Sequence, residues 1–222
     1  MGGHDPYSAS KGCAELVFAA YQRSFFTNKL SGRKIGVASV RAGNAIGGGD
    51  WSVDRIIPDC VRALTKNEPI GVRNPRATRP WQHVLEPLSG YLWLGAMLLE
   101  DPVRYSGAWN FGPQHEATRT VQEVVENFIK LWGYGSWRDI STSGANTVHE
   151  ATFLKLCCDK ANAYLNWKTC LTLEEALELT ADWYKIFYGL NVNKPHSMYA
   201  ICTAQIKEYQ EIARRKNVAW AV

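Results

Sequence analysis

The sequence lacks the patterns that mark a metal site, a disulfide framework or a membrane span. Its six cysteines show neither a C-x-x-C pair nor the Cys/His spacing of a zinc site, so we expect reduced thiols and no metal. The longest apolar run, residues 91–99, is far shorter than the roughly 20 residues that cross a bilayer. Residues 1–6 contain no apolar stretch of the signal-peptide kind. We therefore expect a soluble, cytoplasmic protein without a membrane partner.

Charge of one sign is in short supply as well. The 222 residues carry 25 Lys and Arg against 21 Asp and Glu, which gives a formal charge of +4. A surplus this small does not favour a nucleic-acid partner, since proteins that bind nucleic acid cluster basic residues on one face. Hydrophobic residues, in contrast, make up 46% of the chain and aromatic residues 12%. This composition is typical of a folded globular protein and excludes a disordered tail, a coiled coil and a collagen-like repeat.

No glycine-rich turn of the dinucleotide-binding type is present in the sequence. Such folds place a G-x-G-x-x-G turn between a strand and a helix, so that the pyrophosphate lies on the helix N-terminus. The glycine cluster at residues 43–50 (GNAIGGGD) lacks that spacing and leads into Trp51 and Ser52 rather than directly into a helix. A Walker A pattern is absent too. The sequence therefore contains none of the usual motifs that bind the phosphates of a cofactor.

Strand and helix patterns alternate over the first two thirds of the chain. Asp5 followed by Pro6 predicts the start of a helix that ends near Asn28, with apolar residues at helical spacing from Cys13 to Tyr21. Residues 34–40 (KIGVASV) predict a short, buried strand, and residues 42–50 a glycine-rich loop.

The rest of the chain alternates at first and then becomes helical. Thr120 and Glu123 have the spacing of a capping box, which predicts a helix start. Strand–helix alternation followed by helices indicates an α/β domain whose C-terminal part forms a smaller lobe. The strands are expected over residues 69–73 and 108–111, and the helices over residues 54–66, 86–99, 120–131, 159–165, 172–188 and 197–216.

Tyr7 and Lys11 stand four residues apart in the first predicted helix and therefore share one of its faces. An ammonium group near a phenol favours the phenolate, which can act as a general base toward a sugar hydroxyl. The pattern alone is weak, because Tyr164 and Lys168 have the same spacing and an exposed surface pair would produce it too.

The motifs that surround this pair resemble the extended short-chain dehydrogenase/reductase family. PYSASK at residues 6–11 precedes a strand and loop reading SVRAGNAIG at 39–47, similar to the family's PYxxSK followed by R-x-x-N-x-x-G. Four further stretches narrow the resemblance to the nucleotide-sugar 4,6-dehydratases of that family, and it runs from residue 1 to about residue 189. These stretches are GGGDW at 47–51, RIIPD at 55–59, RPWQHVLEP at 79–87 and WNFGP at 109–113.

The resemblance implies an incomplete Rossmann-like parallel sheet with a smaller, mostly helical C-terminal substrate lobe. Residues 1–50 would be a remnant of the NAD-binding Rossmann domain, residues 51–190 the substrate-binding lobe with returning Rossmann elements, and residues 191–222 a C-terminal helix. In the family, the glycine-rich NAD turn and the residues that perform the dehydration precede the position of Tyr7. We therefore expect an incomplete enzyme here, and a homodimer when it is complete.

The resemblance also implies an activity, the NAD-dependent dehydration of a CDP-sugar in deoxysugar biosynthesis. Tyr7 would take the proton of the sugar 4-hydroxyl, and Lys11 would keep Tyr7 acidic and contact the nicotinamide ribose, so both are expected to be catalytic and to bind the cofactor. Asn44 and Arg79 match family positions that contact the substrate diphosphate. Three further residues are weaker candidates for substrate binding: Arg55, Arg73 and Asn110.

Two alternatives stay open at this point. One is another NAD-dependent sugar-nucleotide epimerase or dehydratase of the same family, and the other is a catalytically inactive fragment that binds a sugar nucleotide. Arg41 is expected to hold the loop that follows it, and His83 to pack rather than react. Residues 157–161 (CCDKA) depart from the family's D-x-S-K-A, and Asp159 is expected to cap the helix that follows.

Overall fold

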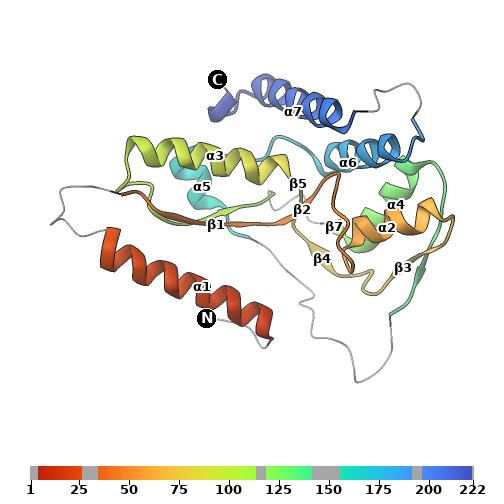
Figure 1. The fold of residues 1–222 in the computed structure, drawn as a ribbon, viewed down its shortest axis with the longest axis horizontal. Helices are drawn as coiled ribbons and strands as arrows, with labels where there is room; N and C mark the ends of the chain where they lie inside the picture. The colour runs from red at the N-terminus through yellow and green to blue at the C-terminus, as the bar shows by residue number, and fades with distance from the viewer. Residues whose placement is uncertain (1–4, 27–34, 114–118, 142–155, 192–196, 222) are drawn as a thin grey trace.

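The computed structural model describes residues 5–26, 35–113, 119–141, 156–191 and 197–221. Over these residues, helices and strands alternate as far as β8, and only helices follow it (Figure 1). The helices are α1 (Pro6–Tyr21), the π-helix Gln22–Phe26, α2 (Ile56–Thr65), α3 (Leu85–Glu100), α4 (Val121–Trp132), α5 (Asp159–Leu165), α6 (Leu173–Phe187), α7 (Met198–Arg215) and the 3₁₀ turn Ala219–Ala221. The strands are β1 (Ala38–Ala42), β2 (Asn44–Ile46), β3 (Ile70–Val72), β4 (Thr78–Arg79), β5 (Trp81–His83), β6 (Gly107–Phe111), β7 (Arg119–Thr120) and β8 (Trp137–Asp139).

Short parallel strand pairs form the centre of the molecule. β1 runs parallel to β6, from Ala38 beside Gly107 to Ala42 beside Phe111. β2 pairs in parallel with β5, and β3 with β8, whereas β4 and β7 are antiparallel. Because parallel neighbours need a long crossover connection, helices separate these strands along the chain. The expected α/β class with a parallel sheet is confirmed.

Two boundaries around the first strand differ from the sequence prediction. Residues 35–37 precede the ladder, and Val37 donates its N–H to the Ser106 hydroxyl at 3.0 Å, so β1 begins only at residue 38; residue 34 lies outside the described residues. The glycine-rich stretch is not all loop either. Asn44 donates its N–H to the carbonyl of Pro80 at 2.9 Å, and this bond begins the ladder of β2 with β5.

Helix α1 begins as the sequence predicts. The Asp5 carboxylate accepts the Ser8 N–H at 2.9 Å, and Pro6 occupies the first helical position. The helix passes at Gln22 into a π-helical turn that runs to Phe26, and the expected end near residue 28 lies outside the described residues.

The apolar residues of α1 do not face a core. Leu16, Val17 and Tyr21 are each more than half exposed, and none of the residues of α1 is buried. The side of the helix that meets the sheet carries Glu15 instead, which pairs with Arg41 of β1. Helical spacing identifies an apolar face, but the spacing does not say which partner covers it.

Of the two other predicted caps, one forms. The predicted capping box joins Thr120 to Glu123 at α4, and a second, unpredicted box joins Thr172 to Glu175 at α6. The exception is Asp159, which is the first helical residue of α5 rather than its cap, because Cys158 takes the cap position without a side-chain hydrogen bond.

Helices cover both faces of the sheet in layers. In Figure 1, α1 lies below β1, whereas α3 and α5 lie above it, with α7 above α3 and α6. One core gathers residues of α2, α4, α6 and β3, and a second joins α3 and α5 to β6. A third, smaller cluster centres on Tyr209 and Ile212 of α7. Within the described parts of the chain, no helix combines the length and the apolarity that crossing a bilayer requires.

A buried carboxylate fixes α7 to the rest of the fold. Glu86 of α3 is 1% exposed, and its Oε1 accepts the backbone N–H groups of Cys170 and Leu171 at 2.8 and 2.6 Å. Its Oε2 accepts the hydroxyl of Tyr209 at 2.8 Å. Burial raises the pKa of Glu86 to about 7, because the loss of solvation outweighs these hydrogen bonds and the nearby Lys216.

The raised pKa of Glu86 predicts a pH-dependent stability. The folded chain retains a proton on Glu86 that the unfolded chain releases near pH 4.5, so the free energy of unfolding falls by about 3 kcal/mol as the pH rises from 4.5 through 7. Glu86→Gln keeps the shape and removes the titration, and most of this fall should disappear. Urea unfolding of both proteins at about pH 5 and about pH 8 measures it. An identical pH dependence of the two proteins would contradict the assignment.

Candidate functional site

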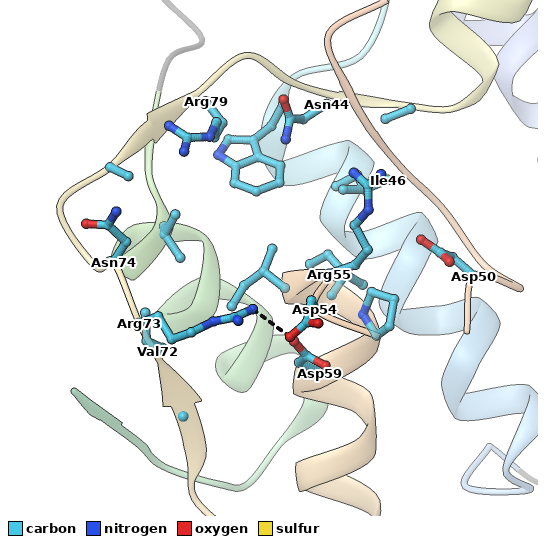
Figure 2. A pocket seen from close by; sticks show the side chains of 18 of the residues that line it. Asn44, Ile46, Asp50, Asp54, Arg55, Asp59, Val72, Arg73, Asn74 and Arg79 are labelled. Carbon is cyan, nitrogen blue, oxygen red and sulfur yellow. Dashed lines mark ion pairs between the residues drawn. The ribbon is translucent and has the colours of Figure 1, made fainter. Parts of the chain in front are cut away.

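A cavity of about 190 Å³ lies between β2, the start of α2, β3 and β4. Figure 2 shows Asn44 and Arg79 at one end of this pocket, and Arg73 reaching toward Asp54 at the other. Arg55 projects between them from the residue that precedes α2. The structure thus brings four of the predicted substrate-binding residues to one cavity. They are Asn44, Arg55, Arg73 and Arg79.

Strand geometry positions the residues at the upper end of the pocket. Asn44 begins β2, and Arg79 ends β4, one residue before Pro80, whose carbonyl accepts the Asn44 N–H. Arg79 is 7% exposed, and its Nη1 donates to the carbonyl of Thr78 at 2.9 Å. A guanidinium this buried presents a planar set of donors in a fixed place, which suits a doubly charged anion.

The N-terminus of α2 adds a second source of positive potential. Ile56, Ile57 and Pro58, the first three residues of the helix, line the pocket together with Arg55. The N–H groups at the start of a helix attract anions, and here Ile56 and Ile57 can supply them, since Pro58 has no N–H and the Asp59 N–H is bonded to the carbonyl of Arg55. The Asp59 carboxylate at this turn is engaged by Arg62, which also donates to the carbonyls of residues 51 and 52 and so ties the preceding loop to α2.

Arg73 is held across the mouth of the pocket by an ion pair. Its Nη2 lies 2.9 Å from Oδ1 of Asp54, and both side chains are more than 60% exposed. Asp54 has a backbone φ of +62°, in the left-handed region that non-glycine residues rarely adopt. The pair leaves Arg73 engaged at the rim of the cavity.

The glycine run above the pocket serves close packing. A Cβ on Gly48 would lie 2.0 Å from the Trp183 ring of α6, and one on Gly43 would lie 2.5 Å from the carbonyl of Pro80. The loop is fixed further by Tyr184, whose hydroxyl donates to the carbonyl of Asp50 at 2.6 Å; burial raises the pKa of this tyrosine to about 12. These glycines therefore accommodate neighbouring side chains and backbone rather than a phosphate.

Tyr7 and Lys11 lie on α1, outside the lining of this pocket. The Lys11 ammonium is 5.4 Å from the centre of the Tyr7 ring, so the two side chains share a helix face as expected. Tyr7 is 68% exposed. Tyr164 and Lys168, the second pair with this spacing, do not share a helix face. Helix α5 carries Tyr164 and ends at residue 165, so Lys168 lies beyond it.

Asn110 is also placed away from the pocket, in a bridge between the sheet and α1. Its Oδ1 accepts from Nη1 of Arg41 at 3.0 Å, and its Nδ2 donates to the carbonyl of Cys157 at 3.0 Å. Arg41 pairs in turn with Glu15 of α1 at 2.6 Å. Arg41 thus fixes the helix that carries Tyr7 and Lys11 to β1, rather than the loop after it.

Sequence reasoning overlooked several residues of the site and judged others by their neighbours. Asp59, the last residue of RIIPD, and Asp54, just before that motif, line the pocket, and Asn74 follows Arg73 directly. His83 is buried, accepts the Leu85 N–H at Nδ1, and does not line the pocket; burial lowers its pKa to about 4. Over the described ranges, no three His, Cys, Asp or Glu side chains are grouped as metal ligands.

The chain is similar to a curated enzyme, although no protein-family model matches it. CDP-glucose 4,6-dehydratase from Salmonella typhimurium is 49% identical to it over 187 residues, which are 83% of this chain and 51% of that enzyme. The predicted resemblance is confirmed. A trifunctional UDP-glucose 4,6-dehydratase, epimerase and reductase of Arabidopsis thaliana is 23% identical over 81% of the chain and 24% of its own length. The chain spans about half the length of the Salmonella enzyme that it matches.

Solved structures share the fold of the chain. dTDP-glucose 4,6-dehydratase from Bacillus anthracis, solved in complex with NAD, has a TM-score of 0.65 at 21% identity, over 83% of this chain and 53% of that one. The epimerase Mth375 of Methanothermobacter thermautotrophicus has a TM-score of 0.69 at 19% identity, over 86% of this chain and 53% of its own. These likenesses confirm a Rossmann-like fold that matches about half of each neighbour.

Release of Arg73 should strengthen anion binding at the pocket. Asp54→Asn removes the ion pair and keeps a residue that tolerates positive φ, so we expect inorganic pyrophosphate to bind about two- to fivefold tighter, the range that exposed ion pairs are worth. Calorimetric titration measures the affinity. Asp101→Asn makes the same charge change at an exposed residue outside the pocket and serves as the control. Equal affinities of the two variants would show that Asp54 does not restrain Arg73.

Proposed function

We propose that the chain forms the substrate-binding part of a CDP-glucose 4,6-dehydratase, an NAD-dependent lyase of nucleotide-sugar metabolism that converts CDP-glucose to CDP-4-dehydro-6-deoxyglucose. The observation that carries this proposal is the 49% identity to the Salmonella enzyme over 187 residues. This level of identity to a dehydratase favours dehydration over the epimerisation that other members of the fold perform. Deoxysugar biosynthesis in the cytoplasm is the setting that we propose for it.

The pocket supports recognition of a sugar nucleotide through its diphosphate. Arg55 and Arg79 line one continuous cavity with the first turn of α2, and Asn44 adds an amide. A guanidinium group can bind two phosphate oxygens at once through its fork of donors. A helix N-terminus also stabilises the negative charge of a phosphate. We propose that the diphosphate binds between Arg79 and α2, with Arg73 exchanging Asp54 for the nucleotide.

Tyr7 and Lys11 are proposed to supply the proton transfer. A phenolate at Tyr7 takes the proton of the sugar 4-hydroxyl, while the Lys11 ammonium 5.4 Å from the ring stabilises the negative charge. The bridge from Glu15 through Arg41 to Asn110 holds their helix against the sheet. Loss of Glu15 or Arg41 would displace Tyr7, the proposed base, without removing it.

NAD is proposed as the cofactor of the complete enzyme, where it would accept and return a hydride. The described residues do not by themselves fit a dinucleotide. The space beside Gly43 is occupied by the carbonyl of Pro80, and the space beside Gly48 by the ring of Trp183. Lys11 and Tyr7 would contact only the nicotinamide end. We propose that the phosphates of NAD are held by a part of the enzyme outside the matched region, and that the complete enzyme is a homodimer.

Substrate binding tests the proposal directly. Arg79→Ala removes a charge-assisted hydrogen bond worth roughly 1.5–3 kcal/mol, so CDP-glucose should bind about ten- to hundredfold more weakly. Isothermal titration of the 222-residue chain measures this affinity. Arg138→Ala, on the exposed side of β8, makes the same substitution outside the pocket. An Arg79→Ala chain that folds and binds CDP-glucose as the unaltered chain does would place the diphosphate elsewhere.

The chain alone should bind NAD weakly and leave CDP-glucose unconverted. The chain contains no G-x-G-x-x-G turn, and the anion-binding groups at α2 are proposed to hold the substrate, so we expect a dissociation constant of NAD in the millimolar range or weaker, about 4 kcal/mol of binding free energy at most. Titration with NAD and a turnover assay at millimolar cofactor measure both. Micromolar NAD affinity together with the 4-keto-6-deoxy product would reveal a dinucleotide site within residues 1–222.

A further inference from the structure

Two adjacent cysteines precede helix α5. Cys157 is exposed, and Cys158, at the N-cap position of the helix, is half-buried. Both thiols are free, and the Cys158 side chain makes no cap hydrogen bond to α5. The six cysteines of the chain contain no other pair of neighbours; they stand at positions 13, 60, 157, 158, 170 and 202. The pair is therefore available for thiol chemistry.

The two thiols differ as a reactive thiol differs from a resolving one. Cys157 lies in solvent, where the sulfur of a small-molecule disulfide can reach it. Burial raises the pKa of the Cys158 thiol more than a hydrogen bond from the Gly112 backbone lowers it. An exposed thiol beside a second cysteine that can displace its adduct is the arrangement typical of redox-sensitive proteins.

The Cys158 side chain has space to change its position. Its sulfur lies beside the turn that follows β6, since a Cβ on Gly112 would be 3.4 Å from it. A cavity of about 90 Å³ adjoins Cys158 and is lined also by Pro113 and Asn162. Because a cysteine side chain rotates about one torsion angle only, such a cavity is sufficient for a change of rotamer.

A disulfide between neighbouring residues requires a change of the backbone that joins them. Cys157 and Cys158 are joined by a trans peptide. Two Cα atoms on either side of a trans peptide are about 3.8 Å apart, whereas those of a disulfide are roughly 4.4–6.8 Å apart. The peptide must therefore distort and turn before the two sulfurs can bond. Such a strained ring is easily reduced again, as regulatory disulfides are and structural ones are not.

The peptide that must turn is also part of the bridge to α1. The carbonyl of Cys157 accepts Nδ2 of Asn110 at 3.0 Å, and Oδ1 of Asn110 accepts Nη1 of Arg41 at 3.0 Å. Arg41 holds Glu15 of α1 through Nε at 2.9 Å and Nη2 at 2.6 Å. Since no residue of α1 is buried, polar contacts of this kind rather than packing hold the helix to the sheet. A turn of the Cys157 carbonyl would remove the outer support of this bridge.

We propose that Cys157 and Cys158 form a redox-sensitive pair, which a small-molecule disulfide such as oxidised glutathione converts to an intramolecular disulfide that loosens α1. The proposal does not depend on which ligand the pocket binds.

The reaction is a pair of thiol–disulfide exchanges. The Cys157 thiolate attacks one sulfur of the small disulfide, so that a bond forms to Cys157 and the other half leaves as a thiolate. Cys158 then loses its proton, its sulfur attacks that of Cys157, and the second half of the small molecule leaves and takes up a proton. Two protein thiols are thus oxidised, and one disulfide is reduced to two thiols.

Mass spectrometry tests the formation of the disulfide. The 222-residue chain is equilibrated in glutathione buffers, remaining thiols are alkylated in acid-quenched samples, and trypsin then releases residues 156–160 (LCCDK) as one peptide. In buffers rich in oxidised glutathione we expect this peptide to lose the mass of two hydrogens, and dithiothreitol to restore it. Cys13 and Cys202, which are exposed single thiols, should carry glutathione instead. If they do so while the peptide 156–160 stays reduced or carries only glutathione, the proposal is wrong.

Hydrogen exchange of the α1 amides tests the effect on the helix. The chain used carries Cys13→Ser and Cys202→Ser, which remove the other exposed thiols. Oxidation of the pair should make the α1 amides exchange about two- to tenfold faster, the factor that the loss of one hydrogen bond is worth. Cys158→Ser keeps the backbone and the side-chain size but cannot close the ring, so its exchange should be the same in both buffers.

Asn110→Ala tests whether the effect passes through the bridge. This variant removes the link between the Cys157 carbonyl and Arg41, so α1 should exchange fast in the reduced chain and no faster after oxidation. Equal exchange of α1 with the pair reduced and oxidised would overturn the proposal. An acceleration that persists in Cys158→Ser or in Asn110→Ala would overturn it as well.

Discussion

The backbone at Gly43 is the point on which the two parts of the fold depend. Its N–H donates to the carbonyl of Phe111 at the end of β6, and the next N–H, that of Asn44, donates to the carbonyl of Pro80 at the start of β5. One continuous segment therefore leaves one partner strand and joins another within a single residue. A Cβ at this position would lie 2.5 Å from the Pro80 oxygen, so only glycine permits the exchange. The position of Asn44 in the pocket follows from it.

The change of partner strand at Gly43 separates two groups of candidate functional residues. On the β1 side, Arg41 and Asn110 tie α1 to the sheet, so the tyrosine–lysine pair is carried by a rigid but exposed helix. On the β2 side, the arginines line the cavity, and the glycine run that follows β2 packs against Trp183. The proposed base and the proposed anion-binding groups thus lie on separate elements that the strand through Gly43 connects, which lets each be positioned by its own packing.

Local signals in the sequence were sufficient wherever the structure is set by residues close along the chain. Asp5 and the box of Thr120 and Glu123 cap the helices that the sequence predicts, because a cap involves a few consecutive residues. The motifs of the resemblance likewise indicated Arg55 and Arg79 of the pocket, whereas Arg73 lies outside these motifs. Orientation was not predictable: the spacing of Leu16 and Val17 reads the same whether a core or open solvent faces them. The Asp54–Arg73 pair and the Glu86 cluster also escaped prediction, since each joins residues from separate elements through tertiary packing.

The parallel register of β1 has a consequence for how the chain folds. Val37, at the entry to the strand, is bonded to Ser106, 69 positions away, and the Glu86–Tyr209 contact spans 123. Contacts between residues so far apart form only after a large loop has closed, and the entropy cost of this closure precedes any stabilisation by the contact. Folding is therefore slower than in helical proteins. During synthesis, β1 emerges long before β6 exists, so the edge of β1 that pairs with β6 stays unpaired over that interval. The nascent chain is therefore exposed to strand-mediated association at this segment, and its early folding would rely on dilution or on a chaperone that shields it.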